Sequence, residues 1–554
     1  MSAPIVYRSE GFELPGVQRN LIRWTIYLGF AALAVGVVNG LDQALSYAGI
    51  NIFRFYPEMR TYYQGLTVHG VFNAIVLTFA FGNGFISLTT ARALGRALST
   101  PIQVAAFAAI AVGTVLAAFA MFTGEATVLY TFYPPLEASW TFYLGLALIV
   151  ISTWLVSADL FLSLARWRRE HPGERIPLLA YMSVVTYLMW DLASLGIAAE
   201  VVLLLLPWSL GLLPGSDPML SRTLFWLTGH PIVYFWLLPV YVSWYGMIPR
   251  QVGGKLFSDS VTRIAFLAFL LLIPVGFHHQ FLDPGISPTL KYFIAVLTFA
   301  IFFPSLMTAF AVMYALEIGG RSHGGKGLIG WFFRIPWRDP SVSAQVLAML
   351  AFMLGGISGL MNASYSMNMM IHNTTFVSGH FHLTVATAVT LSYMGIAYWL
   401  VPYLEQKELW GRTLARWQSW IYFVGVLIFS TGLTIGGFAG MPRRTPIALI
   451  SYPKLPEWQL AGLLAAVGGS LMFIGAVLFF VILAVTILAG QHEAVADIPL
   501  SETVERPTLA GWAVRLDRLG LWLGVSLVLV LIVYGSFIAH HLPPHLISQP
   551  FKAF

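Results

Sequence analysis

The sequence contains no cysteine and few charged residues, and each shortage excludes a class of protein. Without cysteine, the chain itself forms no disulfide, iron–sulfur cluster, haem–thiolate bond or thiolate copper centre. Charged residues make up 10% of the 554 positions, whereas soluble domains contain about 25%. Hydrophobic residues make up 58%, and the mean hydropathy is +0.77. This composition indicates an integral membrane protein.

The apolar segments have the length of membrane-spanning helices. Each is about 20 residues or longer, whereas the strands of a membrane β-barrel are about 10 residues long and alternate in polarity. We therefore predict an all-α membrane protein, with residues 1–554 forming one domain and a single helix bundle without a linker or repeat. The thirteen predicted spans are residues 21–44, 63–90, 101–122, 139–165, 178–206, 223–248, 262–282, 287–317, 342–362, 374–402, 416–438, 457–489 and 512–540.

The positions of lysine and arginine predict the orientation of these spans. With the N-terminus in the cytoplasm, 22 of the 30 Lys and Arg residues fall on the cytoplasmic side and 8 on the other. Positive residues concentrate in the cytoplasmic loops of membrane proteins. This asymmetry supports both the orientation and the number of spans. The net charge of +6 therefore reflects topology, and we expect the lipid bilayer, not nucleic acid, as a partner.

Seven of the thirteen histidines lie within or at the edge of strongly apolar segments. An imidazole in hydrocarbon needs a partner for both ring nitrogens, so a histidine inside a membrane indicates a functional site. In the predicted topology six of the seven reach the outer third of the membrane, from four different spans, and core histidines have no reason to share a depth. The set therefore predicts a metal centre. The seven are His69, His230, His278, His279, His372, His380 and His382.

His380 and His382 cannot bind the same metal from one helix. Residues two positions apart lie about 200° apart around a helix, so these two side chains face opposite ways and can bind two different metals. His69 at a matching depth can pair with one of them to hold a six-coordinate haem that transfers electrons. The other histidine then holds a five-coordinate haem with an open face.

His230, His278 and His279 remain to face that open position. Three neutral imidazoles suit copper, and the lack of sulfur ligands fits a reactive copper site better than a blue-copper one. Tyr234 lies four residues after His230, on the same helix face. A phenol beside a metal-bound histidine can supply one electron and one proton. Splitting dioxygen requires four electrons delivered together.

Several motifs resemble those of subunit I of the haem–copper oxygen reductases. The metal-ligand motifs are Gly229-His230-Pro231-Ile232-Val233-Tyr234, His278-His279 and Gly379-His380-Phe381-His382. Residues 62–70, 125–135 and 224–234 resemble more narrowly the B-family, the ba-type cytochrome c oxidases. The similarity extends over nearly the whole chain and includes a thirteenth span. It implies that His69 and His382 are axial ligands of a low-spin haem and that His380 is the axial ligand of a high-spin haem.

The resemblance also implies the copper site and the reaction. It implies that His230, His278 and His279 bind copper B and that Tyr234 is a catalytic tyrosine joined covalently to His230. We expect a b-type low-spin haem, an a-type high-spin haem and one copper ion. The implied enzyme is a proton-translocating cytochrome c oxidase in the inner (plasma) membrane of a prokaryote. Its expected partners are dioxygen, cytochrome c or a similar donor, and a subunit II that carries a dinuclear copper A centre, because this chain has no cysteine for one.

Two further groups of residues surround the predicted centre. Adjacent arginines can each bind a haem propionate with two hydrogen bonds, and the expected propionate or neighbouring contacts are Arg443, Arg444, His372 and Asn368. A row of hydroxyl groups leads toward the cytoplasm and predicts a proton path, although such groups can also bond to their own helix. Its members are Tyr234, Tyr241, Tyr245, Ser305 and Thr308.

Four positions depart from related oxidases. Asn368 stands where family members carry aspartate, and an amide cannot take up a proton. Ala311 replaces a threonine proposed for the proton path, so water has to bridge there. Ile232 stands where the A-family carries glutamate, and no Asn/Asp entry motif for a second channel is present. Asp191 lies in the middle of the fifth span, where a carboxylate needs a partner or a proton.

Two other functions compete with oxygen reduction. A nitric oxide reductase of the same superfamily would use iron instead of copper, and Tyr234 and the absence of extra acidic ligands disfavour it. A secondary transporter would also contain many helices with buried polar residues, but it has no need for His380 and His382 on opposite faces. The electron donor, cytochrome c or a quinol, is left open by the sequence.

Overall fold

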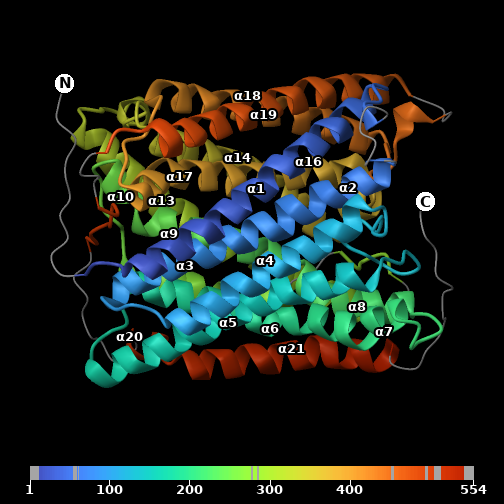
Figure 1. Ribbon diagram of the computed structural model, residues 1–554, viewed down its shortest axis with the longest axis horizontal. Coiled ribbons are helices and arrows are strands. Elements are labelled where there is room, and N and C mark those ends of the chain that lie inside the picture. Colours follow the sequence, from blue (N-terminus) through green and yellow to red (C-terminus); the bar gives the residue numbers. More distant parts are fainter. Residues whose placement is uncertain are drawn as a thin grey trace.

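The computed structural model describes residues 12–53, 59, 61–275, 279–283, 286–450, 455–492, 497–504 and 513–541. Within these ranges the regular elements are helices, and three isolated β-bridges pair single residues outside them. Eleven helices or continuous helical runs in this part of the chain are long and apolar enough to cross a membrane. They lie side by side along the longest axis of the molecule (Figure 1).

A helix occupies each of the thirteen predicted spans. The elements are α1 (Gly16–Tyr47), α2 (Tyr62–Gly70), η2 (Val71–Val76), α3 (Leu77–Leu94), α4 (Thr100–Phe122), α5 (Trp140–Glu170), α6 (Leu178–Glu200), η3 (Val201–Leu205), α7 (Leu206–Ser209), α8 (Pro218–Gly229), α9 (Pro231–Gly246), α10 (Ile248–Gln251), α11 (Asp259–Leu272), η4 (Ile273–Val275), α12 (Pro288–Ala300), α13 (Phe302–Ser322), α14 (Pro340–Ala363), α15 (Tyr365–Ile371), α16 (Thr375–Phe381), η6 (His382–Val389), α17 (Thr390–Glu405), α18 (Arg412–Phe438), α19 (Pro456–Ala489), α20 (Ala513–Leu516) and α21 (Leu519–His541).

Three spans differ in detail from the prediction. The span predicted at 223–248 consists of α8 and α9, which meet at His230, because Pro231 has no N–H to continue the ladder. The span predicted at 287–317 consists of α12 and α13, and Pro304 removes the donor that would bond to the last residue of α12. In the seventh span, α11 and η4 end at Val275, and residues 276–278 lie outside the described ranges.

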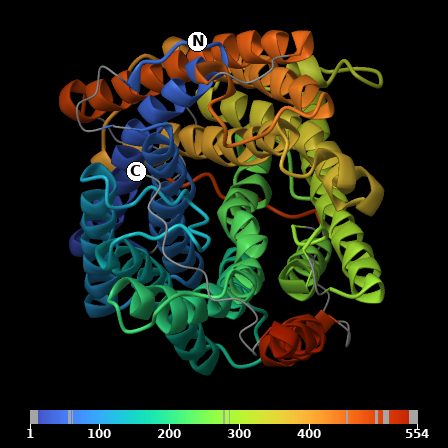
Figure 2. The same cartoon turned by 90° about the vertical axis from the view of Figure 1, so that its right-hand side faces the viewer.

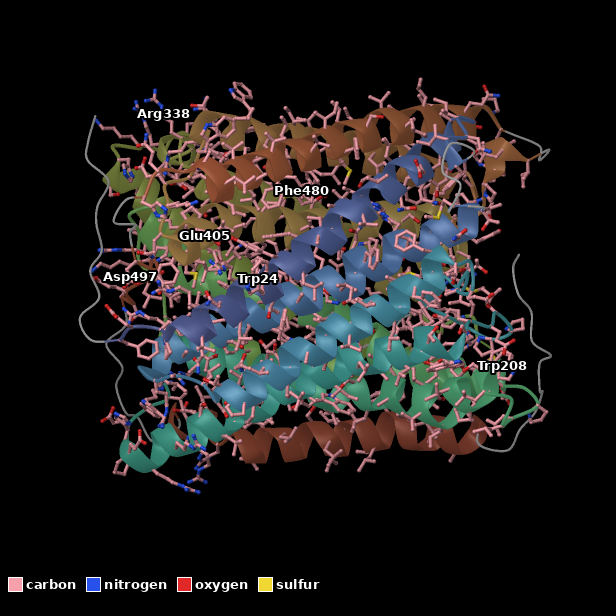
Figure 3. The ribbon with its side chains drawn as sticks, in the orientation of Figure 1. Trp24, Trp208, Arg338, Glu405, Phe480 and Asp497 are labelled. Atoms are coloured by element: carbon pink, nitrogen blue, oxygen red, sulfur yellow. The ribbon has the colours of Figure 1, made fainter. Side chains whose placement is uncertain are left out.

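Charged residues from connections that are far apart in sequence lie together at one end of the bundle. Arg338, Glu405 and Asp497 lie at one end, and Trp208 lies at the opposite end (Figure 3). The three charged residues belong to connections predicted to face the cytoplasm. Two of them form ion pairs there: Glu405 with Arg23 at 3.3 Å and Asp497 with Arg92 at 3.0 Å. Seen along the helices, α21 lies at the edge of the bundle, on the side opposite α18 and α19 (Figure 2).

Asp191, whose partner the sequence could not supply, has one in the structure. Ser157 of α5 donates a hydrogen bond to its Oδ2 atom, so the pair joins α5 to α6 within the membrane. The Oδ1 atom is buried and has no hydrogen-bond partner among the described residues. A carboxyl group inside a membrane needs such a partner. This contact indicates a structural role.

We expect Asp191→Asn to leave cofactor content and turnover near the parental values, because asparagine keeps an oxygen acceptor for Ser157. Asp191→Ala leaves Ser157 without that acceptor and should lower the free energy of unfolding by roughly 1 kcal/mol. Thermal unfolding in detergent and oxygen consumption across a pH series would measure both effects. A large, pH-dependent loss of turnover in Asp191→Asn would contradict the structural role and make this carboxyl group a proton carrier.

Candidate metal centre

His69 and His382 face each other across the interior of the bundle. His69 is in the last turn of α2, and His382 begins η6. Their ring centres are 6.3 Å apart, and the ring planes differ by 11°. Two metal–nitrogen bonds of about 2.0–2.1 Å each, together with the radii of the two rings, span this separation. The pair therefore fits two axial ligands on opposite sides of one metal ion.

A backbone carbonyl fixes the orientation of each ring. His69 Nδ1 lies 2.9 Å from the oxygen of Gly36 in α1, and His382 Nδ1 lies 2.8 Å from the oxygen of Ser378 in α16. When Nδ1 carries the hydrogen and donates to a carbonyl, the lone pair is on Nε2. Metal-binding histidines usually have such a carbonyl or carboxylate partner, which sets both tautomer and orientation.

Glycine on α1 makes room for the His69 ring. A Cβ atom on Gly40 would lie 2.7 Å from His69 Cε1. Such a distance is too short for a carbon–carbon contact, so any side chain at position 40 would displace the ring. At position 36 a Cβ atom would lie 2.0 Å from Oδ1 of Asn73, so that side chain would have to move. Asn73 follows His69 by one helical turn, and its Nδ2 lies 3.1 Å from His69 Nδ1.

A cavity of about 170 Å³ opens beside this pair, and its lining is basic at one end. Both histidines line it, as do Tyr130, Arg443 and Arg444. The Arg444 guanidinium lies over the Tyr130 ring, 5.4 Å from its centre, and neither arginine forms an ion pair with a residue that the structure describes. The cavity thus offers two imidazoles and two unpaired guanidinium groups. These groups suit a metal-bearing ligand with carboxylates.

The outer loops around this basic end show the effect of the shared positive charge. Burial, together with the adjacent Arg444, lowers the pKa of the Arg443 guanidinium to about 10. Burial, followed by the charges of Arg443, Arg222 and Arg444, lowers the pKa of the His372 imidazole to about 4. Arg443 Nη2 donates to Asn373 Oδ1 at 3.1 Å. A negatively charged group bound here would relieve this repulsion.

Asn368 lies near His372 but is held by other groups. Its side chain is buried, and its Nδ2 donates to the backbone oxygen of Asn362 at 2.8 Å. Its side-chain oxygen is buried and has no hydrogen-bond partner among the described residues. The amide therefore binds the end of α14 and leaves an acceptor toward its surroundings. It cannot exchange a proton as an aspartate would.

His380 points away from the His69–His382 pair, toward α14. Its Nδ1 lies 2.9 Å from Ser358 Oγ and 3.1 Å from the oxygen of Gly355. Gly359 also borders this ring: a Cβ atom there would lie 3.3 Å from His380 Cε1. Ser358 and the small residues beside it thus hold His380 in the way that the Gly36 carbonyl holds His69. The two histidines of α16 and η6 serve different sides of one helix.

His230 and His279 form a second histidine pair. His230 Nδ1 lies 3.2 Å from His279 Nε2, and two nitrogens bound to one metal at about 2.0–2.1 Å and a tetrahedral angle are about 3.3 Å apart. The third predicted ligand, His278, lies outside the described residues. Among those that the structure describes, no group of three His, Cys, Asp or Glu side chains is arranged to hold a metal ion.

Aromatic rings support this second histidine pair. The His279 ring stacks on Trp226 with centres 3.9 Å apart and planes 6° apart. The Tyr234 ring lies 5.0 Å from the His230 ring at an angle of 63°. Trp226 and Tyr234 flank His230 in sequence by four residues on either side. The sequence prediction missed Trp226, although its spacing from His230 is the one that places residues on the same helix face.

The predicted row of hydroxyl groups is connected at its inner part. Tyr245 Oη donates to Thr308 Oγ1 at 2.9 Å, which joins α9 to α13. Tyr241 is fully buried, and its hydroxyl faces the side chain of Ser305 in α13. Ser305 Oγ bonds back to the oxygen of Ile301 at 3.1 Å. Ala311 is buried and contributes no hydroxyl, so a continuous path needs water between these groups.

Two of the ligand helices contain π-helical turns that the sequence did not predict. The turn η2 begins two residues after His69, and the turn η6 begins at His382. A third, η3, follows the buried Glu200, which accepts a hydrogen bond from Ser221. Such turns insert one extra residue into an α-helix and are frequent at functional sites. No residue pattern in a single sequence marks them.

The comparisons with known proteins agree on one family. The family model described as "Cytochrome C and Quinol oxidase polypeptide I" matches residues 20–471. Cytochrome c oxidase subunit 1 of Thermus thermophilus is 45% identical over 543 residues, which cover 95% of this chain and 96% of that protein. A probable quinol oxidase subunit 1 of Staphylococcus epidermidis is 25% identical over 493 residues, or 84% of this chain and 70% of that one.

A solved structure shares the fold. It is a chain of a haem–copper terminal oxidase dimer determined by cryo-EM, 36% identical to this chain, with a TM-score of 0.91. The match covers 97% of this chain and 95% of that chain. The similarity therefore includes the whole helix bundle, and the helices that carry the predicted ligands lie within it.

The arrangement of His69, His382 and His380 leads to a prediction about ligand loss. His69→Ala and His382→Ala should each remove the same haem, the low-spin one, because their side chains face each other. His380→Ala should remove the high-spin haem instead. Reduced-minus-oxidised spectra, with and without carbon monoxide, distinguish the two haems. His323→Ala is a matched control, since Nδ1 of that ring contacts the backbone oxygen of Gly319 at the end of α13. Loss of different haems in His69→Ala and His382→Ala would contradict the pairing.

Proposed function

This chain belongs to the cytochrome c and quinol oxidase polypeptide I family, and from that membership we propose which of its residues bind the cofactors, move protons and receive electrons. It is the subunit I of a haem–copper terminal oxidase, a multi-pass membrane enzyme that reduces dioxygen in respiratory electron transport. Subunits of this family work with haem, copper B and a subunit II. The residue assignments below are the proposal.

We propose that His69 and His382 bind the low-spin haem. The observation that carries this assignment is the parallel arrangement of the two rings at 6.3 Å, each with Nδ1 at a backbone carbonyl and Nε2 available for a metal. Arg443 and Arg444 line the same cavity and would bind the haem propionates. The b-type for this haem and the a-type for the high-spin haem belong to the proposal as well.

We propose that the oxygen-reducing centre lies between His380 and the pair formed by His230 and His279. His380 would bind the high-spin haem, with Ser358 and Gly355 fixing its ring. His230 and His279, with His278, would bind copper B. When bound, this haem and copper supply the site at which dioxygen is held and reduced. The stacking of Trp226 on His279 would keep that ring in place and exclude water from one side of it.

Tyr234 is the proposed source of an electron and a proton close to this centre. Its ring lies against His230 and is partly buried. The proton is held on its hydroxyl oxygen, and the apolar surroundings favour the neutral phenol until an electron leaves it. A covalent bond between an imidazole nitrogen of His230 and a ring carbon of Tyr234 is part of the proposal, formed with loss of the N–H and C–H hydrogens and with dioxygen as the two-electron oxidant. Such a bond would keep the phenol beside the copper ligand through each turnover.

Protons for water formation would enter from the cytoplasmic side along α9 and α13. Tyr245 and Thr308 are already hydrogen-bonded there, and Tyr241 lies between them and Tyr234 in sequence. Ser305 would act beside Tyr241, and water would bridge the position at which Ala311 contributes no hydroxyl. Uptake from the inner side and electron entry from the outer side allow the reaction to charge the membrane, and they fit the proposed proton translocation.

Electrons would come from a partner on the outer side. The chain has no cysteine, so a dinuclear copper A centre would be carried by subunit II. We propose cytochrome c as the donor, because the Thermus relative is a cytochrome c oxidase at 45% identity, whereas the Staphylococcus quinol oxidase is 25% identical. The proposed location is the plasma membrane of a prokaryote.

Spectra and oxygen consumption of the purified complex test the proposed function directly. We expect two haems, one copper ion in this subunit beyond those of subunit II, and oxygen consumption driven by reduced cytochrome c. Metal analysis on the isolated complex gives the copper content. A complex that reduced oxygen with quinol and not with cytochrome c would refute the proposed donor. A complex with a non-haem iron in place of copper would refute the proposed ligand set.

Tyr234→Phe should retain both haems and copper but lose most of its turnover. The change removes the hydroxyl group and little volume, so the metals keep their ligands while the proton and electron donor is absent. Loss of a positioned proton donor slows a reaction by roughly 10²-fold or more. Steady-state oxygen consumption normalised to haem content measures the loss. Tyr292→Phe, on the exposed face of α12, is the matched control. Parental activity in Tyr234→Phe would remove this tyrosine from the mechanism.

Thr308→Ala and Tyr245→Phe should slow proton delivery and leave the haem spectra unchanged. Both remove the hydrogen bond between Tyr245 and Thr308, worth about 0.5–1.5 kcal/mol, which corresponds to a slowing of about two- to tenfold. Thr308→Ala also removes the bond from that hydroxyl to the Pro304 oxygen of its own helix. Flash-initiated single-turnover kinetics should show a delay confined to the steps that take up protons. Thr298→Ala is the control, because that hydroxyl bonds only to Ile294 of its own helix. Equal rates in both variants and the parent would mean that this row only packs the helices.

A further inference from the structure

A second cavity lies at the inner end of the bundle, away from the proposed metal sites. Its volume is about 270 Å³, and it opens between the end of α5, the turn after it, and the segment that begins with α20. In the predicted topology both segments face the cytoplasm, and α20 lies at the charged end of the molecule (Figure 1). The lining residues are Arg168, His171, Gly173, Glu174, Arg175, Val514, Asp517 and Arg518.

Two of the charges that line the cavity are neutralised by α11. Arg175 Nη1 lies 2.9 Å from Asp259 Oδ1, and Asp517 Oδ1 lies 2.9 Å from Arg263 Nη1. The backbone N–H of Ile176 donates to the other oxygen of Asp517 at 3.2 Å. These contacts fix the segment that precedes α21 against the turn after α5. Because Arg263 and the N–H of Ile176 occupy the Asp517 oxygens, this carboxylate does not pair with Arg168 or Arg518.

Positive charge and hydrogen-bond donors remain unsatisfied in the cavity. Neither Arg168 nor Arg518 forms an ion pair with a described residue, and Arg168 donates only to the backbone oxygen of Asp517. Arg175 Nε and Nη2 are buried without a hydrogen-bond partner in the part of the chain that the structure describes. A buried donor without an acceptor is unfavourable. The lining thus sets three arginines against two carboxylates, of which Glu174 is exposed and Asp517 is already paired with Arg263.

We propose that this cavity binds the phosphate of an anionic phospholipid from the inner leaflet. A phosphate ester supplies several charged oxygen acceptors, and guanidinium groups bind such oxygens in pairs. The inner leaflet of a membrane carries anionic lipids, which bind basic pockets between helices at the cytoplasmic surface. Arg168, Arg175 and Arg518 would surround the phosphate from two segments that are more than three hundred residues apart.

The surroundings of the cavity favour a lipid over a free phosphate ion. The cavity lies where α21 begins, and α21 exposes apolar side chains along the direction in which acyl chains would run. These exposed residues are Leu521, Val525, Leu527, Val528, Leu531 and Ile532. A free phosphate ion makes no use of this apolar face. A phospholipid would bind the cavity with its headgroup and the face of α21 with its tails, and it would thereby hold the last helix against the bundle.

Lipid retention by the intact oxidase complex tests the proposal. The complex is exchanged into nanodiscs that contain phosphatidylglycerol and phosphatidylcholine, extracted gently, and weighed by native mass spectrometry. We expect the parent to retain phosphatidylglycerol and the double variant Arg168→Gln/Arg518→Gln to retain roughly tenfold less. Phosphatidylglycerol should raise the melting temperature of the parent and not that of the double variant. Unchanged haem spectra would show that the double variant is folded.

The neighbouring residues provide a matched control. Arg169 and Arg515 are exposed, lie in the same two segments and do not line the cavity. Arg169→Gln/Arg515→Gln removes the same charge and should retain lipid as the parent does. An equal loss of phosphatidylglycerol in the two double variants would show that the lipid is held by general charge attraction and would overturn the proposed site. Displacement of the lipid by inorganic phosphate alone would overturn the lipid assignment and leave a simple anion site.

Discussion

The structure depends on a requirement of the imidazole ring: inside a membrane, both of its nitrogens need a partner. For His69, His380 and His382 one nitrogen is bound by a carbonyl or hydroxyl group of a neighbouring turn or helix. That contact leaves the other nitrogen for a metal and also sets the direction in which it points. The close approach of α1 to His69, for which glycine at position 40 leaves room, follows from the same requirement.

The sequence predicted the spans and the candidate ligands well because both depend on local patterns. Hydropathy predicted a helix in each of the thirteen spans, although the described helix of the seventh ends at Val275 and the sixth and eighth each consist of two helices. The two-residue spacing of His380 and His382 placed them on opposite faces. The breaks at Pro231 and Pro304 were not predicted, although proline marks them. The hydrogen-bond and stacking partners of the histidines were not predicted either. Gly36, Ser358 and Trp226 act from other helices, and helix packing is not encoded in a local pattern.

The same difference between local patterns and helix packing explains which parts of the proton path and of the Asp191 contact could be predicted. Helical spacing predicted that Tyr241 and Tyr245 share a face, but only the packing of α9 against α13 joined Tyr245 to Thr308. The partner of Asp191 could not be predicted either, because Ser157 is one of several serines in α5 and helix rotation selects it. Polar groups inside a membrane find such partners between helices. These contacts form only when the helices pack against one another.

The π-helical turns η2 and η6 give the ligand helices a property that a regular helix lacks. Each residue advances an α-helix by about 100°, so one additional residue in a turn rotates everything beyond it by that amount relative to what precedes it. The outer half of such a helix can therefore aim its histidine at a cofactor while the inner half keeps the phase required for packing against its neighbours. The two halves can vary independently. A family of enzymes with different cofactors can thus keep one scaffold and change the aim of its ligands.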